Sequence, residues 1–181
     1  MRTFLSALGL AAVCAQPLED QFTSLWPDNF TMPSKSYSGY LNVTDTKALH
    51  YIWVDSMHEP MSDPVVVWFN GGPGCSSLLG FMQENGPWVI EDFETLPHEN
   101  PYPWNANVSM VYIEAPAGVG FSTDRAENTT LTYNDMQTAV DNMAAIEKLF
   151  EKFSSYLANP LFLSGESYAG IYVPYLAWQI Y

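Results

Sequence analysis

The sequence predicts an α/β fold with a mostly parallel sheet, and three features of the 181-residue chain lead to that prediction. Short, continuous apolar stretches rich in β-branched residues occur at 63–70, 108–116 and 161–165, as in strands covered on both faces. A longer stretch at 133–156 has apolar residues spaced by three and four, as in an amphipathic helix. Strands that alternate with helices favour parallel pairing.

The first elements are predicted to be a hairpin and two buried strands. From Ser36 to Ser56, apolar residues alternate on both sides of Thr44-Asp45-Thr46, a sequence of turn composition. We expect this segment to form an antiparallel ribbon at the edge of the sheet. DPVVVWFN and VSMVYIEAP are then the first two buried strands.

The C-terminal part is predicted to form a helix, a strand and a second helix. The helix between Tyr133 and Tyr156 has Thr132 or Asn134 as its candidate N-cap. LFLSG supplies a third buried strand. YAGIYVPYLAWQIY then begins another helix, with Pro174 in its first turns, where proline is least costly.

The charge of the chain excludes some classes of partner. Six basic and twenty acidic side chains give a formal net charge of −14. Nucleic acids and anionic membranes bind clustered lysine and arginine, so we expect neither as a partner. A hydrophobic content of 48% argues for a globular domain with a core of its own.

Residues 1–15, MRTFLSALGLAAVCA, have the pattern of a secretory signal peptide. Arg2 precedes an apolar stretch from Leu5 to Val13, and small residues stand before a possible cleavage site at Gln16. An N-terminal core helix is the alternative, but the abrupt change to polar, proline-containing sequence favours cleavage. No other apolar stretch approaches membrane length, so we expect residues 16–181 to be a soluble product.

Glycosylation and cysteine content agree with a secretory route. Sequons without an intervening proline occur at Asn29, Asn42, Asn107 and Asn128. Removal of residues 1–15 takes Cys14 away and leaves Cys75 as a lone cysteine in an oxidising compartment. An unpaired cysteine there implies a missing partner.

Ser167 in LFLSGESYAG is a candidate nucleophile. A nucleophilic serine between a strand and a helix needs a tight turn of small residues, which Gly165, Ala169 and Gly170 provide. The second glycine position of the usual pattern is alanine here, and an ordinary strand-to-helix corner remains the alternative.

The stretch WFNGGPGCSSLLG, from Trp68 to Gly80, follows the first buried strand. Its glycines and proline cannot continue a strand, and they leave backbone N–H groups unshielded by side chains. In a hydrolase built on such a sheet, one oxyanion donor is the residue after the nucleophile, here Tyr168, and another lies in a loop like this one. A plain β-turn is the alternative.

Together, NGGPGCSS (Asn70 to Ser77) and GESYAG (Gly165 to Gly170) resemble the serine carboxypeptidases, which have the α/β-hydrolase fold. Further matching motifs lie between them, in the family's order: ENGPW, NPYPWN and APAGVGFS. The resemblance runs from about Ser36 to Tyr181. It implies an α/β-hydrolase fold truncated after the nucleophile elbow, with residues 16–181 as the N-terminal part of the domain.

The resemblance also implies roles for individual residues. Ser167 would form the acyl-enzyme, and Gly72 and Tyr168 would give the two oxyanion N–H groups. The substrate-binding residues implied by the family are Asn70, Glu84, Glu166 and Trp68. Cys75 would form a disulfide with a cysteine far downstream that this sequence does not contain. We expect no metal and no cofactor.

Two carboxyl groups beside a substrate carboxylate cannot all be ionised, so one proton must be shared among them. Binding of a peptide with a free C-terminal carboxylate should therefore weaken as pH rises, which suits a lysosome or vacuole, although secretion is equally open. The alternative for Glu84 is a solvated charge at a helix end. For Glu166 it is an acidic residue that favours a helix N-terminus.

The general base is the missing part. His50, His58 and His98 all precede Ser167, whereas these hydrolases have the order serine, acid, histidine. We therefore expect the triad Asp and His to lie outside this sequence and the chain alone to be inactive. The leading hypothesis is a serine-type carboxypeptidase. The alternatives are an acyltransferase on the same scaffold and a non-catalytic, secreted peptide-binding form.

Overall fold

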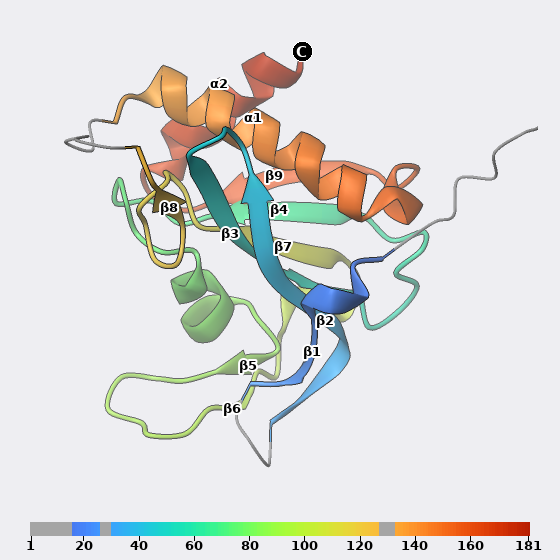
Figure 1. The fold of residues 1–181 in the computed structure, drawn as a ribbon. Helices are drawn as coiled ribbons and strands as arrows, with labels where there is room; N and C mark the ends of the chain where they lie inside the picture. Colours follow the sequence, from blue (N-terminus) through green and yellow to red (C-terminus); the bar gives the residue numbers. More distant parts are fainter. Residues whose placement is uncertain (1–15, 26–29, 127–132) are drawn as a thin grey trace, which may run out of the picture.

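The computed structural model describes residues 16–25, 30–126 and 133–181. The predicted signal peptide and the sequons at Asn29 and Asn128 lie outside the described residues. Within the described part, a mixed sheet carries two long helices on one face (Figure 1).

The sheet contains β1 (Gln21–Ser24), β2 (Thr31–Asn42), β3 (Lys47–Val54), β4 (Val65–Phe69), β7 (Ser109–Ile113), β8 (Thr123–Asp124) and β9 (Leu161–Gly165). Its strand order is β1-β2-β3-β7-β4-β9, and β8 also pairs with β3. A separate ribbon consists of β5 (Trp88–Val89) and β6 (His98–Glu99). The helices are α1 (Asp135–Lys152) and α2 (Ala169–Ile180), with short helical turns η1 (Leu18–Asp20), η2 (Gly80–Glu84), η3 (Trp104–Ala106) and η4 (Ser154–Tyr156).

The predicted hairpin is confirmed, but its position at the sheet edge is wrong. Strands β2 and β3 pair antiparallel, and the Thr44 hydroxyl accepts the Lys47 N–H at 2.9 Å in the turn. β1 pairs with the outer side of β2, while β3 pairs with β7. The reason lies in β3, whose residues are almost all buried, because an interior strand is covered on both faces.

The two predicted strands β4 and β7 are confirmed, and every residue in each is buried. β9 forms where predicted, but the expectation that it is buried is wrong: Phe162 is 55% exposed. Among the described residues, β9 pairs only with β4, so one of its edges stays open. The sheet is also mixed rather than mostly parallel, because the N-terminal strands join it antiparallel while β7, β4 and β9 run parallel.

Helix α1 begins at its predicted cap, where the Asn134 side chain accepts the Gln137 N–H at 2.9 Å. Helix α2 contains Pro174 as expected. Both helices pack on one face of the sheet in a core that includes Trp53 and Phe153, whose rings stack at 4.1 Å. The opposite face carries a second apolar cluster, which includes Trp68 and Tyr112.

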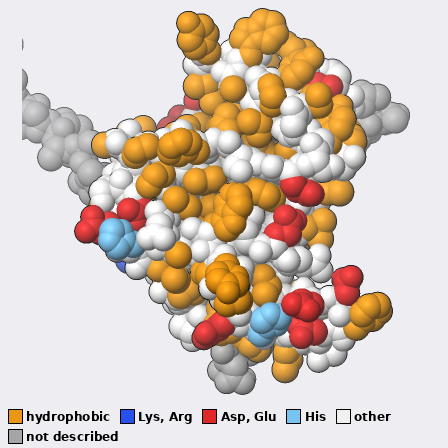
Figure 2. All heavy atoms as spheres, turned by 180° about the vertical axis from the view of Figure 1, so that it is seen from behind, with side chains coloured by type: hydrophobic (Ala, Val, Ile, Leu, Met, Phe, Trp, Pro, Cys, Tyr) orange, Lys and Arg blue, Asp and Glu red, His pale blue; other side chains and the backbone are white. Residues whose placement is uncertain are grey.

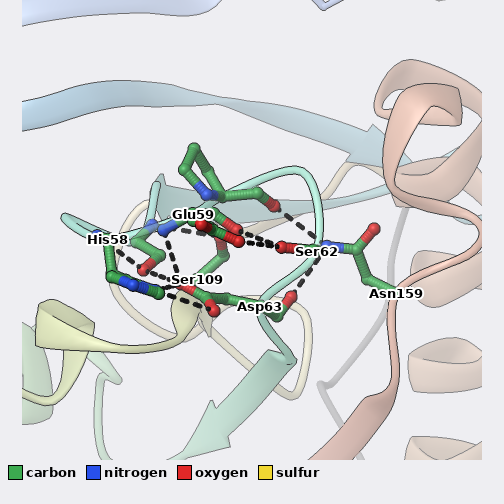
Figure 3. A network of polar contacts seen from close by, with 8 residues as sticks. His58, Glu59, Ser62, Asp63, Ser109 and Asn159 are labelled. Atoms are coloured by element: carbon green, nitrogen blue, oxygen red, sulfur yellow. Dashed lines mark hydrogen bonds and ion pairs between the residues drawn. The ribbon is translucent and has the colours of Figure 1, made fainter.

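A polar network closes the loop between β3 and β4, as Figure 3 shows. The Asp63 carboxylate accepts the Ser56 hydroxyl at 2.6 Å and the Glu59 N–H at 2.8 Å. Asn159, before β9, donates its amide to the carbonyls of Pro60 and Asp63. These contacts lie at the N-terminal end of β4, whereas the glycine-rich loop follows its C-terminal end. They therefore set where the central strands begin.

The apolar surface of the molecule is unevenly distributed. Apolar side chains gather over α2 and the neighbouring strand β9 (Figure 2). The large apolar side chains exposed on these two elements and at the chain end are Phe162, Ile171, Trp178, Ile180 and Tyr181. In the described ranges, no helix is both long and apolar enough to cross a membrane.

Candidate functional site

Ser167 lies at the sharp turn from β9 into α2. Its φ of +54° is unusual for a residue other than glycine, and its side chain is exposed. A Cβ at Gly165 would overlap the Phe69 carbonyl and the Ala169 side chain, so this position requires glycine. Close approach of β4, the turn and α2 therefore produces the strained conformation that lifts the serine clear of the sheet.

The glycine-rich loop after β4 lies directly against this turn. A Cβ at Gly71 would stand 2.5 Å from the Tyr168 backbone nitrogen and 2.9 Å from the Ser167 Cβ. Gly72 has a φ of +105°. Within the described residues, the backbone N–H groups of Gly72 and Tyr168 have no hydrogen-bond acceptor. Two unpaired donors in adjoining segments could both donate hydrogen bonds to one anionic group beside Ser167.

Asn70 is the centre of a second cluster. Its Oδ1 accepts the Trp68 indole N–H at 2.8 Å and the Gly80 backbone N–H at 3.1 Å. Both partners are donors only, so they fix which way the amide points. Its Nδ2 then donates to Glu84 at 2.9 Å and to Glu166 at 3.2 Å. The structure thus brings together Asn70, Glu84, Glu166 and Trp68, with Glu166 coming from 96 residues beyond Asn70 in the sequence.

The residues of this cluster differ in burial, with the asparagine and the tryptophan buried and the two glutamates at the surface. Asn70 is 1% and Trp68 is 5% exposed, whereas both glutamates are exposed. Glu84 ends the turn η2, and Glu166 immediately precedes Ser167. The carboxyl groups therefore stand at the surface next to the serine and are held by a rigid amide beneath them.

Sequence reasoning missed two residues that support the cluster. Gly80 has no room for a side chain, because a Cβ would overlap the Trp68 indole nitrogen. The Ser77 hydroxyl donates to the Ile113 carbonyl at 2.7 Å and accepts the Asn70 N–H at 3.1 Å. Both lie in the glycine-rich loop and its continuation, and the presence of serine and glycine there was the available signal.

A cavity of about 520 Å³ is bordered by Tyr168, the residue that follows Ser167, and no sequence pattern indicated it. Its lining includes Tyr168, Tyr172, Asp135 and Gly74, and none of the four residues of the Asn70 cluster. The Tyr168 hydroxyl donates to the Asp135 carboxylate at 3.1 Å, and this hydrogen bond raises the pKa of the phenol. The segment after the nucleophile thus connects the turn to the start of α1.

The described histidines all pair with carboxylates. His50 contacts Glu114 at 3.0 Å, His58 contacts Asp63 at 3.3 Å and His98 contacts Glu94 at 3.2 Å. Within the described residues, the Ser167 hydroxyl has no hydrogen-bond partner. None of the three described histidines therefore forms a hydrogen bond with Ser167.

The remaining predicted residues lie on or near the surface. Asn42 and Asn107 are exposed, as an attached glycan requires, and their modification stays a prediction. Cys75 has a free thiol and is partly buried in the glycine-rich loop. In the parts of the chain that the structure covers, no cluster of three or more His, Cys, Asp or Glu side chains could hold a metal ion.

Comparison with known proteins gives consistent matches. The chain is 46% identical over 164 residues to the lysosomal protective protein of Mus musculus, covering 90% of this chain and 34% of that protein. It is 42% identical over 186 residues to serine carboxypeptidase-like 20 of Arabidopsis thaliana, with coverage of 98% and 37%. The chain thus spans about a third of the length of these curated relatives.

The fold comparison agrees. The structure matches that of Kex1Δp, a prohormone-processing carboxypeptidase from Saccharomyces cerevisiae, with a TM-score of 0.71 and 25% identity. The match covers 81% of this chain and 34% of that one. This similarity, with the strand-to-helix turn at Ser167, shows the α/β-hydrolase fold.

The family model for serine carboxypeptidases matches residues 27–181, which include the glycine-rich loop, the Asn70 cluster and the serine turn. Because that match extends over most of the sequence, the chain belongs to the serine carboxypeptidase family.

Proposed function

We propose that this chain carries the nucleophile and the carboxylate-binding half of a serine carboxypeptidase, an enzyme that releases C-terminal residues from peptides. One observation carries the proposal. A buried asparagine holds two glutamate side chains at 2.9 Å and 3.2 Å, immediately beside a serine whose neighbouring N–H groups have no acceptor among the described residues. Carboxyl groups that can share a proton suit recognition of another carboxylate better than recognition of a neutral chain.

In the proposed reaction, the C-terminal carboxylate of the peptide accepts hydrogen bonds from Asn70 and from a protonated Glu84 or Glu166. Because ionisation of all three carboxyl groups would cause repulsion, substrate binding is expected to weaken as pH rises. An acidic compartment is therefore the proposed site of action. The name of the similar mouse protein, lysosomal protective protein, places that relative in the lysosome, which supports this proposal.

Ser167 Oγ then attacks the carbonyl carbon of the last peptide bond and gives its proton to a general base. The carbonyl oxygen becomes an oxyanion that accepts the N–H groups of Gly72 and Tyr168. The C–N bond breaks, the released amino acid takes up the proton, and water hydrolyses the acyl-enzyme. We propose that the base and its orienting acid come from residues outside this sequence, since the described histidines pair elsewhere.

The location part of the proposal rests on sequence. Residues 1–15 are proposed to direct the chain into the secretory pathway, and Asn42 and Asn107 are proposed glycosylation sites. Cys75 is proposed to pair with a cysteine outside this sequence. Mass spectrometry of the protein from its own cells tests all three assignments, and an unmodified N-terminus at Met1 would refute the first.

The experiment for the activity uses the protein made from its full reading frame. Incubation with a peptide at acidic pH should release its C-terminal amino acid, and mass spectrometry of the quenched reaction should place the acyl group on Ser167. Ser167→Ala should abolish both signals, whereas the exposed Ser62→Ala should change neither. Unchanged release by the Ser167→Ala variant would exclude the proposed mechanism.

A further inference from the structure

Glu114 is a buried acidic residue that the proposed reaction does not use. It directly follows β7 and is fully buried. Its carboxylate accepts the Ser76 hydroxyl and the Phe121 N–H, the latter at 2.8 Å, and contacts His50 Nδ1 at 3.0 Å. A buried carboxylate is retained only where such partners replace its water.

These partners keep the group charged. Burial alone would raise the pKa of Glu114, but hydrogen bonds from His50, Ser76 and the Phe121 N–H outweigh it and hold that pKa below its usual value. A carboxylate that stays ionised can accept three hydrogen bonds at once, which a neutral carboxylic acid does less well. The cluster is therefore built around the anion.

The turn that follows is shaped to fit this carboxylate. A Cβ at Gly120 would overlap Glu114 Oε1, and the residue has a φ of +54°, so both space and conformation require glycine. The Ser122 hydroxyl donates to the Glu114 carbonyl at 2.6 Å and accepts the His50 N–H at 2.8 Å. The APAGVGFS motif thus wraps the Glu114 side chain, which explains why Gly120 is a glycine.

The Glu114 carboxylate also contacts the glycine-rich loop, through Ser76. Ser76 is four residues from Gly72, the proposed oxyanion donor, and its neighbour Ser77 holds both Asn70 and the end of β7. Ser76 also accepts the Leu78 N–H at 3.2 Å. Two consecutive serines therefore connect the glycine-rich loop to the end of β7. Ser77 donates to the Ile113 carbonyl, and Ser76 donates to the carboxylate of Glu114, the residue after β7.

His50 completes the arrangement from the opposite side. Its Nε2 contacts the Ser38 hydroxyl at 2.9 Å, and the ring borders a surface hollow of about 620 Å³. The ring is thus held between β2 and Glu114. A side chain fixed at both nitrogens limits where the carboxylate can lie.

We propose that Glu114, held by His50, is a positioning residue that sets the glycine-rich loop 70–77 in the shape that places the Gly72 N–H for the oxyanion. The kinetic part of this inference rests on the proposed carboxypeptidase function. The structural part, in which Glu114 orders the loop, does not depend on activity.

The test compares Glu114→Gln with Glu151→Gln in the protein made from its full reading frame. Both change a carboxylate to an amide, but Glu151 is an exposed residue of α1 whose carboxylate, among the described residues, pairs with Lys148 alone. Loss of an oxyanion donor costs about 100- to 1,000-fold in kcat, so misplacing one should cost about 10- to 100-fold. We expect that fall in kcat for Glu114→Gln, a KM within about twofold of the original, and no change for Glu151→Gln.

Backbone hydrogen exchange gives a readout that needs no activity. Glu114→Gln should speed exchange of the amides in 71–79 and 117–122 and leave those of α1 unchanged. Ser76→Ala should speed exchange in 71–79 only. The double variant should add little to the kinetic effect of Glu114→Gln, since both remove one shared contact.

The outcomes separate the two proposals. If the wild-type protein is inactive but Glu114→Gln still speeds exchange in the loop, the proposed function is refuted and the ordering role of Glu114 stands. Unchanged loop exchange in Glu114→Gln, or a kcat loss matched in Glu151→Gln, would overturn the inference. A rise in KM with kcat unchanged would also overturn it, because the oxyanion forms after substrate binds.

Discussion

Replacing Asn70 with alanine removes its Oδ1, which accepts hydrogen bonds from two buried N–H groups. It also removes its Nδ2, which donates hydrogen bonds to Glu84 and Glu166. The Trp68 indole N–H and the Gly80 N–H lose their bonds of 2.8 Å and 3.1 Å, and both residues are buried. An unsatisfied buried group costs about 1–3 kcal/mol. Two such groups should lower the free energy of unfolding by about 2–4 kcal/mol, because water entering the vacated space recovers part of the loss.

Thermal unfolding followed by circular dichroism measures this effect. For a domain of this size, about 2–4 kcal/mol corresponds to a fall in Tm of roughly 4–16 °C. In protein made without attached glycans, Asn42→Ala is the matched control, because Asn42 is exposed and its side chain makes no hydrogen bond within the described residues. If Asn70→Ala and Asn42→Ala unfold at the same temperature as the original protein, the view of Asn70 as a structural centre of the site is wrong.

Three further predictions concern the loop, the acid stability and the open edge. Gly71→Ala places a Cβ 2.5 Å from the Tyr168 nitrogen and should abolish peptide hydrolysis. Gly170 was expected to be a required small residue of the serine turn, but a Cβ there meets no atom within 4 Å, so Gly170→Ala should leave hydrolysis unchanged. Hydrogen bonds from Ser56 and the Glu59 N–H lower the pKa of Asp63, so its stabilising effect is complete above the unfolded pKa of about 3.9 and is lost as pH falls through the folded value. Asp63→Asn should therefore lower Tm at pH 7, and the Tm of the variant should fall less between pH 7 and pH 3 than that of the original protein. A Tm difference between variant and original protein that is the same at both pH values would contradict this. Phe162→Lys should reduce self-association of a polypeptide limited to residues 16–181, measured by light scattering, because Phe162 is 55% exposed on the open strand β9. Leu18→Lys, at a residue that is even more exposed but lies on η1, should not reduce it, and equal effects of both would argue against a role for β9.

Local signals in the sequence were enough to predict much of the fold. The strands β4 and β7 are short, continuous and rich in β-branched residues, and such stretches have few alternatives to a buried strand. Asn134 could be identified as a cap because its side chain acts only on its own helix. The hairpin was predictable for the same reason, since its turn and its alternation are local.

Features that depend on distant partners could not be predicted. The apolar composition of β9 is that of an interior strand, yet Phe162 is exposed because only β4 pairs with it among the described residues. Strand composition also does not report which neighbour a hairpin chooses, so the pairing of β3 with β7 was missed.

The candidate site shows the same division. The resemblance predicted which residues would meet at Asn70, because the motifs keep their order and residue types. The support beneath them, through Ser77 and Glu114, joins segments that have no sequence pattern in common. A buried carboxylate looks no different in sequence from an exposed one, so the role of Glu114 appeared only when its partners were in place.

The most direct test of the central claim compares two substrates that differ at one group. A peptide with a free C-terminal carboxylate and the same peptide as its C-terminal amide are offered to the protein made from its full reading frame, at acidic pH. Each charged hydrogen bond is worth about 1.5–3 kcal/mol, so loss of the carboxylate should lower kcat/KM by about 100-fold. A ratio near one would contradict the assignment of Asn70, Glu84 and Glu166 to carboxylate recognition.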